Sequence, residues 1–128
     1  MAGDEMFNIS YNGIITVNRG DSFTLPLALQ LGNKLNPKRL EITENTYIYF
    51  GLMEPNQPFE NALIRKKVGI ESVDSDGNVY IHFSPKDTVT LLPGKYYYQI
   101  KLQEVDPTDV TNFDVYTIVD KTQFYIME

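Results

Sequence analysis

Apolar residues recur at every second position in several separate stretches of this chain, and this period of two limits the folds that the chain can adopt. In residues 23–31 the odd positions are all Phe or Leu, and the even positions are Thr, Pro, Ala or Gln. In residues 96–102 the even positions are Tyr, Tyr, Ile and Leu. Successive side chains of a strand point to opposite faces, so each stretch predicts a strand with one face buried against a second layer.

Other segments carry strand-type residues between turn signals. We expect a hairpin over residues 7–17, turning at Asn12-Gly13, and another over 73–83, turning at Asp76-Gly77, because Asn-Gly and Asp-Gly supply the positive φ angles of tight turns. Pro26 predicts an edge or a bulge, since proline cannot donate to a ladder. The remaining predicted strands are 47–53, with Ile48, Phe50 and Leu52 inside, the charged edge strand 62–68, and 113–119 and 122–127, which are divided by Asp120-Lys121.

Helical signals are confined to one short segment. Ser84 suits an N-cap, Pro85 the first helical position, and Asp87 the positive end of the helix, so one helical turn is expected near 85–91. Residues 104–112 are rich in Asp, Asn and Pro and predict a polar loop. The sequence therefore predicts an all-β, immunoglobulin-like antiparallel sandwich of about seven to nine strands. It forms one domain over 1–128, with a flexible N-terminus at 1–5.

Composition excludes several classes of protein. The 128 residues carry a net charge of −6 without a basic run, which argues against nucleic acid as a partner. The chain has no cysteine, which removes disulfides and thiolate-bound metals. No stretch has the roughly 20 consecutive apolar residues of a membrane helix, and the acidic start lacks the pattern of a signal peptide. We expect no membrane partner.

The sequence contains no catalytic signature. His82 is the only histidine, and the alternation places it on the surface beside Tyr80 with no acid to orient it. The glutamates are scattered, and neither a phosphate-binding glycine loop nor a GxSxG elbow occurs. We therefore predict no catalytic residue, no cofactor, no metal and no enzyme activity. An enzyme built from scattered acids around His82 is the least favoured alternative.

Two short motifs have simpler explanations than their best-known functions. Asp74, Asp76 and Asn78 have the spacing of a calcium loop, but the glycine and the glutamate that should follow are Val79 and Pro85, so a hairpin turn is favoured. Residues 19–21, Arg-Gly-Asp, spell the tripeptide that integrins bind. Their position just before the long apolar strand favours a turn.

Aromatic residues are frequent, with nine tyrosines and seven phenylalanines. Where Tyr96 and Tyr98 point inward, Tyr97 points outward. Tyr80, Tyr97 and Tyr116 are therefore our candidate interface residues, able to bury against a protein or to stack on a sugar. Ordinary cross-strand pairing explains the same residues equally well.

The order of these motifs resembles a known family. An opening strand with the 19–21 turn leads into the long apolar strand, followed by the Asp76-Gly77 hairpin, a capped turn at 84–88 and the segment LPGKYYYQI at 92–100. This layout, from about residue 14 to 126, is similar to the small β domain of tailed-phage and prophage tail or baseplate proteins, including the N-terminal domain of baseplate upper proteins. Residues 31–45 are longer than the connection expected there.

The resemblance implies a non-enzymatic structural domain of a phage tail or baseplate. It would be made in the bacterial cytoplasm and located in the virion. Its expected role is protein–protein assembly or the anchoring of a receptor-binding part, with other tail or baseplate proteins as partners and a homo-oligomer possible. The alternative function is a carbohydrate-binding sandwich that uses Tyr80, Tyr97 and Tyr116.

Overall fold

A computed structural model describes the chain except for residues 1–7, 10–12, 29, 33–36, 40–41 and 76–77. The predicted flexible segment 1–5, Leu29 of the apolar ladder and the Asp76-Gly77 turn lie outside the described residues. The strands are β1 (Asn8–Ile9), β2 (Ile15–Asn18), β3 (Phe23–Ala28), β4 (Gln30–Gly32), β5 (Pro37–Arg39), β6 (Thr46–Met53), β7 (Ile64–Val68), β8 (Asn78–Phe83), β9 (Gly94–Asp106) and β10 (Asp109–Met127). The helical elements are α1 (Pro85–Thr88) and the 3-10 turns η2 (Phe59–Asn61) and η3 (Ile70–Ser72).

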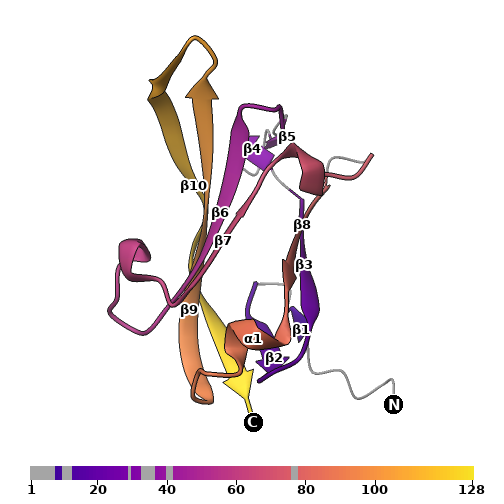
Figure 1. The fold of residues 1–128 in the computed structure, drawn as a ribbon, viewed down its shortest axis with the longest axis vertical. Coiled ribbons are helices and arrows are strands. Elements are labelled where there is room, and N and C mark those ends of the chain that lie inside the picture. Colours follow the sequence, from indigo (N-terminus) through magenta and orange to yellow (C-terminus); the bar gives the residue numbers. More distant parts are fainter. Residues whose placement is uncertain (1–7, 10–12, 29, 33–36, 40–41, 76–77) are drawn as a thin grey trace.

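The strands form two facing layers (Figure 1). One layer is a six-stranded sheet in the order β1-β2-β10-β9-β6-β7, and the other is the antiparallel pair of β3 and β8. A separate short ribbon pairs β4 with β5. The pairing of β2 with β10 is parallel, which is the one departure from an antiparallel arrangement among the described strands.

Aromatic rings fill the space between the layers. Phe50 of β6 is 1% exposed and lies 5.0 Å from Phe83 of β8 in an edge-on contact, measured between ring centroids. On its own sheet it stacks on Tyr98 at 5.6 Å. Phe23 of β3 stacks on Phe83 at 4.4 Å, which extends the cluster along the second layer. Ile48, Phe50 and Leu52 are all buried, as the alternation predicts.

The strand order confirms the immunoglobulin-like sandwich. Strands β3 and β8 correspond to strands B and E of that fold, and β6, β9 and β10 to strands C, F and G, with β7 as an added neighbour of strand C. Antibody domains pack a tryptophan of strand C against a disulfide between strands B and F. This chain has neither tryptophan nor cysteine, and Phe50 with its ring neighbours fills the corresponding space.

A tyrosine at the start of β9 ties the strand to the turn before it. Tyr96 is buried, and its hydroxyl donates to the carbonyl oxygen of Leu92, four residues earlier, at 2.5 Å. Tyrosines in this place form the tyrosine corner of immunoglobulin-like domains. Burial, with a smaller contribution from the charge of Glu54, raises the pKa of the Tyr96 phenol, so the group remains a neutral donor.

Replacing Tyr96→Phe removes this bond and leaves the Leu92 carbonyl without that donor. We expect a loss of about 1–1.5 kcal/mol in the free energy of unfolding, since the ring still fills its site. Urea denaturation measures the loss. Tyr125→Phe is the matched control, because within the described part of the chain that hydroxyl bonds to the side chain of Gln123, two residues away, and to no backbone group. Equal losses in the two variants would contradict a special role for the corner.

Several other predictions are confirmed. β1 pairs with β2 as the N-terminal hairpin, and Gly13 has a φ of 88° between them. Among the described residues, β7 has one strand neighbour and is a charged edge. Pro26 faces only β8, so its other side is an edge within the part of the chain that is described. α1 is a single turn that begins with Pro85, and Asp87 reaches back to Ser84 as in a capping box.

The chain after Leu102 differs from the prediction. The expected loop at 104–112 is wrong, because β9 and β10 continue into it as a paired ribbon whose turn is only Pro107-Thr108. The expected break at Asp120-Lys121 is also wrong, since β10 runs from Asp109 to Met127. A register shift between Val119 and Thr122 absorbs those two residues as an irregularity within the ladder. Backbone pairing between β9 and β10 thus keeps residues 104–112 in an ordered ribbon, although almost none of their side chains contribute to the core.

Candidate functional site

The three candidate interface tyrosines lie on different surfaces. Tyr80 is on β8, between buried neighbours, so it points away from the sandwich on the two-stranded layer. Tyr97 points outward from the six-stranded sheet, where Lys95 Nζ lies 5.8 Å from the centre of its ring. Tyr116 is opposite Leu102, and thus on the other face of that sheet. The structure does not bring these rings together into one platform for a sugar.

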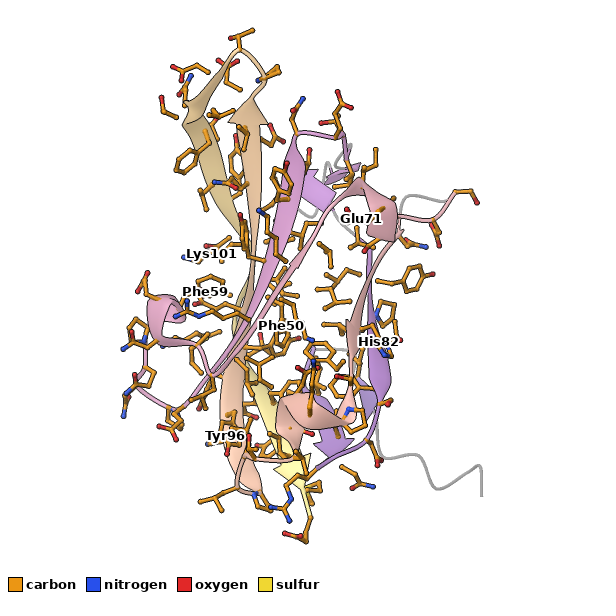
Figure 2. All side chains as sticks on the ribbon, viewed as in Figure 1. Phe50, Phe59, Glu71, His82, Tyr96 and Lys101 are labelled. Carbon is orange, nitrogen blue, oxygen red and sulfur yellow. The ribbon has the colours of Figure 1, made fainter. Side chains whose placement is uncertain are left out.

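His82 lies on the outer side of β8, as predicted. Its side chain is exposed, and Nδ1 lies 3.1 Å from Oγ1 of Thr24 on the neighbouring strand β3 (Figure 2). Thr24 is also the residue directly opposite His82 in the ladder between β3 and β8. This environment is that of a surface histidine in a cross-strand pair.

The two short motifs take structural roles within the described residues. Asp74 accepts hydrogen bonds from the backbone N–H of Asn78 at 2.9 Å and from the hydroxyl of Tyr80 at 2.9 Å, and Asp76 lies outside those residues. In the 19–21 turn, the backbone N–H of Arg19 donates to Met127 and that of Gly20 to Oγ1 of Thr88. Gly20 has a φ of 83°, which explains the glycine.

A feature that the sequence did not predict is the end of the β9–β10 hairpin, which projects beyond the sandwich (Figure 1). We call residues 104–117 the arm. Its apolar side chains are strongly exposed: Val110 by 73%, Val115 by 52%, Phe113 by 49% and Tyr116 by 38%. The arm also has four acidic residues and no basic one: Glu104, Asp106, Asp109 and Asp114. The strand-type run 113–116 was the available signal, but the polar residues before it favoured a loop.

Hydrogen bonds shape the turn of the arm. The carboxylate of Asp106 accepts from the backbone N–H and the hydroxyl of Thr108, at 2.9 and 2.8 Å. Asp109 accepts in the same way from Thr111, at 3.1 and 2.6 Å. The Thr108 bonds lower the pKa of Asp106, and the Thr111 bonds lower that of Asp109, so both remain ionised at neutral pH. The arm is thus an ordered, acidic and partly apolar ribbon.

Cations and aromatic rings gather on the outer face of the six-stranded sheet. Register places Arg65 opposite Gly51, and Lys67 and Lys101 on either side of Tyr49. Lys67 Nζ lies 4.4 Å from the ring centre of Tyr47. Lys101 Nζ lies 4.9 Å from the ring centre of Phe59, and both residues are labelled in Figure 2. We call this the basic patch, and its residues are Tyr47, Tyr49, Phe59, Arg65, Lys67 and Lys101.

The patch is hollowed beside Phe59. A cavity of about 280 Å³ is lined by Tyr49, Phe50, Phe59, Glu60, Arg65, Lys66 and Lys67. Arg65 is held there by a hydrogen bond from its guanidinium to the carbonyl oxygen of Glu60. Aromatic walls beside cationic groups suit an apolar side chain that arrives next to a carboxylate.

Gly51 makes room for one wall of this hollow. A Cβ atom at Gly51 would lie 2.7 Å from Cε2 of Phe59 and 3.2 Å from Cβ of Ala62. The bare backbone of β6 therefore lets the connection through η2 lie against the sheet. Glycine is otherwise unfavourable inside a strand, and the close approach of Phe59 accounts for it here.

Gly51→Ala should displace Phe59 and cost about 1–2 kcal/mol in the free energy of unfolding, because the added methyl overlaps the ring. Chemical denaturation of a double-mutant cycle with Phe59→Ala tests this. Once Phe59 is truncated, the same glycine substitution should cost far less. An equal cost in both backgrounds would show that the ring is not the cause.

Comparison with known proteins adds no identification. No family model matches the chain, and no match was found among curated proteins. In the part of the chain that is described, no helix has the length and apolar character needed to cross a membrane. Among those same residues no group of three or more histidine or acidic side chains could hold a metal ion. The arm and the basic patch are the two surface features of the described residues that could contact another molecule.

Proposed function

We propose that this chain is a non-enzymatic assembly domain of a phage tail or baseplate, which joins its neighbours through the arm. The observation that carries the proposal is the exposure of Val110, Phe113 and Val115 on a ribbon that projects from the sandwich. Exposed apolar side chains gathered on one projecting element are typical of a surface that another protein covers. The resemblance of residues 14–126 to tail and baseplate domains supports the same role and a location in the virion.

The arm can serve a partner because the sandwich does not need it. Among the described residues, all those of the buried core lie outside segment 104–117, and the nearest along the chain are Leu102 and Phe124. Its strands are nevertheless direct continuations of central strands of the six-stranded sheet, so a load on the arm is passed into the core. Tyr116 is the candidate interface residue that lies on this element.

The experiment is to shorten the arm and follow incorporation into particles. Joining Glu104 to Asp114, its partner in the ladder, through Asn-Gly replaces residues 105–113 by a tight hairpin turn. Mass spectrometry of purified tail particles should find the wild-type chain in them, and the shortened chain should be absent. Thermal unfolding should change by only a few degrees, because no core residue is removed.

The control is Tyr80→Ala, which truncates an exposed aromatic side chain on the opposite layer and should leave incorporation unchanged. Absence of the wild-type chain from purified particles would overturn the proposed location. Normal incorporation of the shortened chain would overturn the role of the arm.

A further inference from the structure

The hollow beside Phe59 is a concave site on the outer face of the six-stranded sheet, away from the second layer (Figure 2). Tyr49 is opposite Lys67 in the ladder of β6 and β7. Gly51, the next outward-facing residue of β6, is opposite Arg65 and lies against the ring of Phe59. At about 280 Å³ the hollow is slightly smaller than the roughly 300–1,000 Å³ of pockets for drug-sized molecules, so it suits a single ring.

The aromatic walls of the hollow are already in place. The hydroxyl of Tyr49 donates to Oε1 of Gln103 at 3.0 Å, which fixes that ring. Phe59 lies on bare backbone at Gly51, where a Cβ atom would be only 2.7 Å from its Cε2, and Lys101 Nζ lies 4.9 Å from its ring centre. A site whose side chains are held before binding loses little conformational entropy when a ligand enters.

The rim of the hollow carries charges of both signs. Arg65 and Lys67 supply N–H donors, and Glu60 supplies a carboxylate acceptor, all on exposed side chains. Asp120 is near enough to Lys101 for those two charges to interact. The cations alone would favour an anionic ligand, but the two carboxylates repel an anion, just as the lysines and the arginine repel a cation. The rim therefore favours a neutral ligand that both accepts and donates hydrogen bonds.

We propose that this hollow binds one neutral sugar ring, either free or as part of a glycan. A pyranose presents C–H groups on its faces, which pack on aromatic rings such as those of Tyr49 and Phe59. Its edge presents hydroxyl groups, each of which can accept a hydrogen bond and donate one. The hydroxyls accept from Arg65 and Lys67 and donate to the carboxylate of Glu60.

This binding site goes beyond the assembly role and is separate from the arm. Neither residues 104–117 nor the three candidate interface tyrosines line the hollow. Aromatic residues around one ring-sized hollow satisfy the geometric requirement that the three scattered tyrosines do not meet.

An NMR titration of the ¹⁵N-labelled full chain tests the proposal. The probes are the methyl glycosides of glucose, galactose, mannose and N-acetylglucosamine, each added to about 50 mM. At least one should shift the backbone amide signals of residues 49–50, 59–60 and 65–67, with a Kd of roughly 1–10 mM, as expected for so small a ligand. If none of the four shifts these signals, the proposal is overturned.

Substitutions locate the bound ring. Phe59→Ala removes one wall and should weaken binding at least tenfold. Glu60→Ala removes an exposed acceptor, leaves the backbone carbonyl that Arg65 uses, and should weaken binding about threefold or more. Tyr97→Ala is the matched control, because its ring lies on the same face beside Lys95 but does not line the hollow, and the Kd should not change. Equal losses for Tyr97→Ala and Phe59→Ala would contradict the site.

Thermal unfolding of each variant checks that the sandwich is intact. Should Phe59→Ala fail to fold, Glu60→Ala still decides the question, because its side chain is exposed. An unchanged Kd for the sugar in Glu60→Ala would overturn the proposed contacts.

Benzoate distinguishes an aromatic carboxylate from a sugar as the occupant. Glu60→Ala should weaken binding of the glycoside but strengthen any binding of benzoate, because the carboxylate accepts from the first and repels the second. Shifts at the hollow with benzoate and with none of the glycosides would overturn the proposal.

The inference and the proposed function fail separately. The chain with the shortened arm should bind the glycoside with the wild-type Kd, since Gln103 and the hollow are retained. A chain that enters tail particles but binds no glycoside would overturn the sugar site alone. A chain that binds a glycoside but is absent from tail particles would overturn the proposed location alone.

Discussion

Phe50→Ala should lower the free energy of unfolding by about 3–5 kcal/mol, the cost of emptying a large buried aromatic site. The ring contacts both layers, since it lies 5.0 Å from Phe83 across the sandwich and 5.6 Å from Tyr98 on its own sheet, measured between centroids. Neither layer can close the space without moving the other. A domain of this size is stable by about 5–15 kcal/mol, so the loss is a large part of the total.

Urea denaturation and thermal unfolding measure this effect, and we expect the melting temperature to fall by roughly 10–20 °C. Phe50→Leu keeps most of the volume and should cost about 1–1.5 kcal/mol. Phe113→Ala is the matched control, because it makes the same truncation at a half-exposed ring of the arm and should stay within about 0.5 kcal/mol under conditions where the chain is monomeric. Similar losses for Phe50→Ala and Phe113→Ala would refute the central place of Phe50.

Asp87→Ala is expected to have the second largest effect on stability, about 2–3 kcal/mol. Its Oδ2 atom accepts a hydrogen bond from Lys66 Nζ at 2.8 Å and another from the backbone N–H of Ser84 at 2.8 Å. The ammonium of Lys66 lies 5.3 Å from the ring centre of Phe83, at the mouth of the core. One carboxylate thus joins β7 of the six-stranded sheet to α1, which follows β8 of the other layer.

Asp87→Asn separates the two contributions of this carboxylate, because the amide oxygen still accepts from Ser84 while the charge is lost. We expect the asparagine variant to lose less than the alanine variant in chemical denaturation. Lys66→Met, which keeps an apolar stem, should remove most of the remaining difference between aspartate and asparagine. A full-sized effect of Asp87→Asn in the Lys66→Met background would show that the ion pair is not involved.

The carboxylate of Asp87 should also make the free energy of unfolding depend on pH in the acid range. Burial opposes ionisation, but the hydrogen bonds from Lys66 and Ser84 and the charge of Lys66 outweigh it and hold the pKa of Asp87 below its usual value. A lowered pKa in the folded state stabilises the fold above the pKa of the unfolded state, about 3.9, and this stabilisation is lost as the pH falls through the folded value. The stability difference between wild type and Asp87→Asn should therefore be full at neutral pH and shrink below about pH 4.

The sequence predicted those parts of the fold in which burial alternates. Ile48, Phe50 and Leu52 are inside because only one face of β6 meets the second layer, and the same holds for the even positions of 96–102. Side-chain period reports burial, and burial is what the sandwich imposes on these strands. The turns were predicted where special backbone angles require particular residues, as at Gly13 and Gly20.

The arm and the basic patch could not be predicted in this way. Few side chains of the arm are buried, so its apolar residues do not follow the period of two that a buried face imposes. Its strands form because the backbone hydrogen bonds between β9 and β10 continue into it from the body of the sheet. The patch depends on register, because Arg65, Lys67 and Lys101 come from two strands that are separated by β6. The contact of Gly51 with Phe59 joins residues eight positions apart through the path of a loop, for which no local pattern exists.

The parallel pairing of β2 with β10 gives the molecule a direction of mechanical strength. Ile15 lies beside Phe124 and Asn18 beside Met127, and the backbone N–H of Arg19 continues the ladder to Met127. A force that pulls β2 by its N-terminal end and β10 by its C-terminal end slides the strands past each other and loads all of these bonds at once. A domain built this way resists tension along its sequence far better than one whose end strands unzip bond by bond.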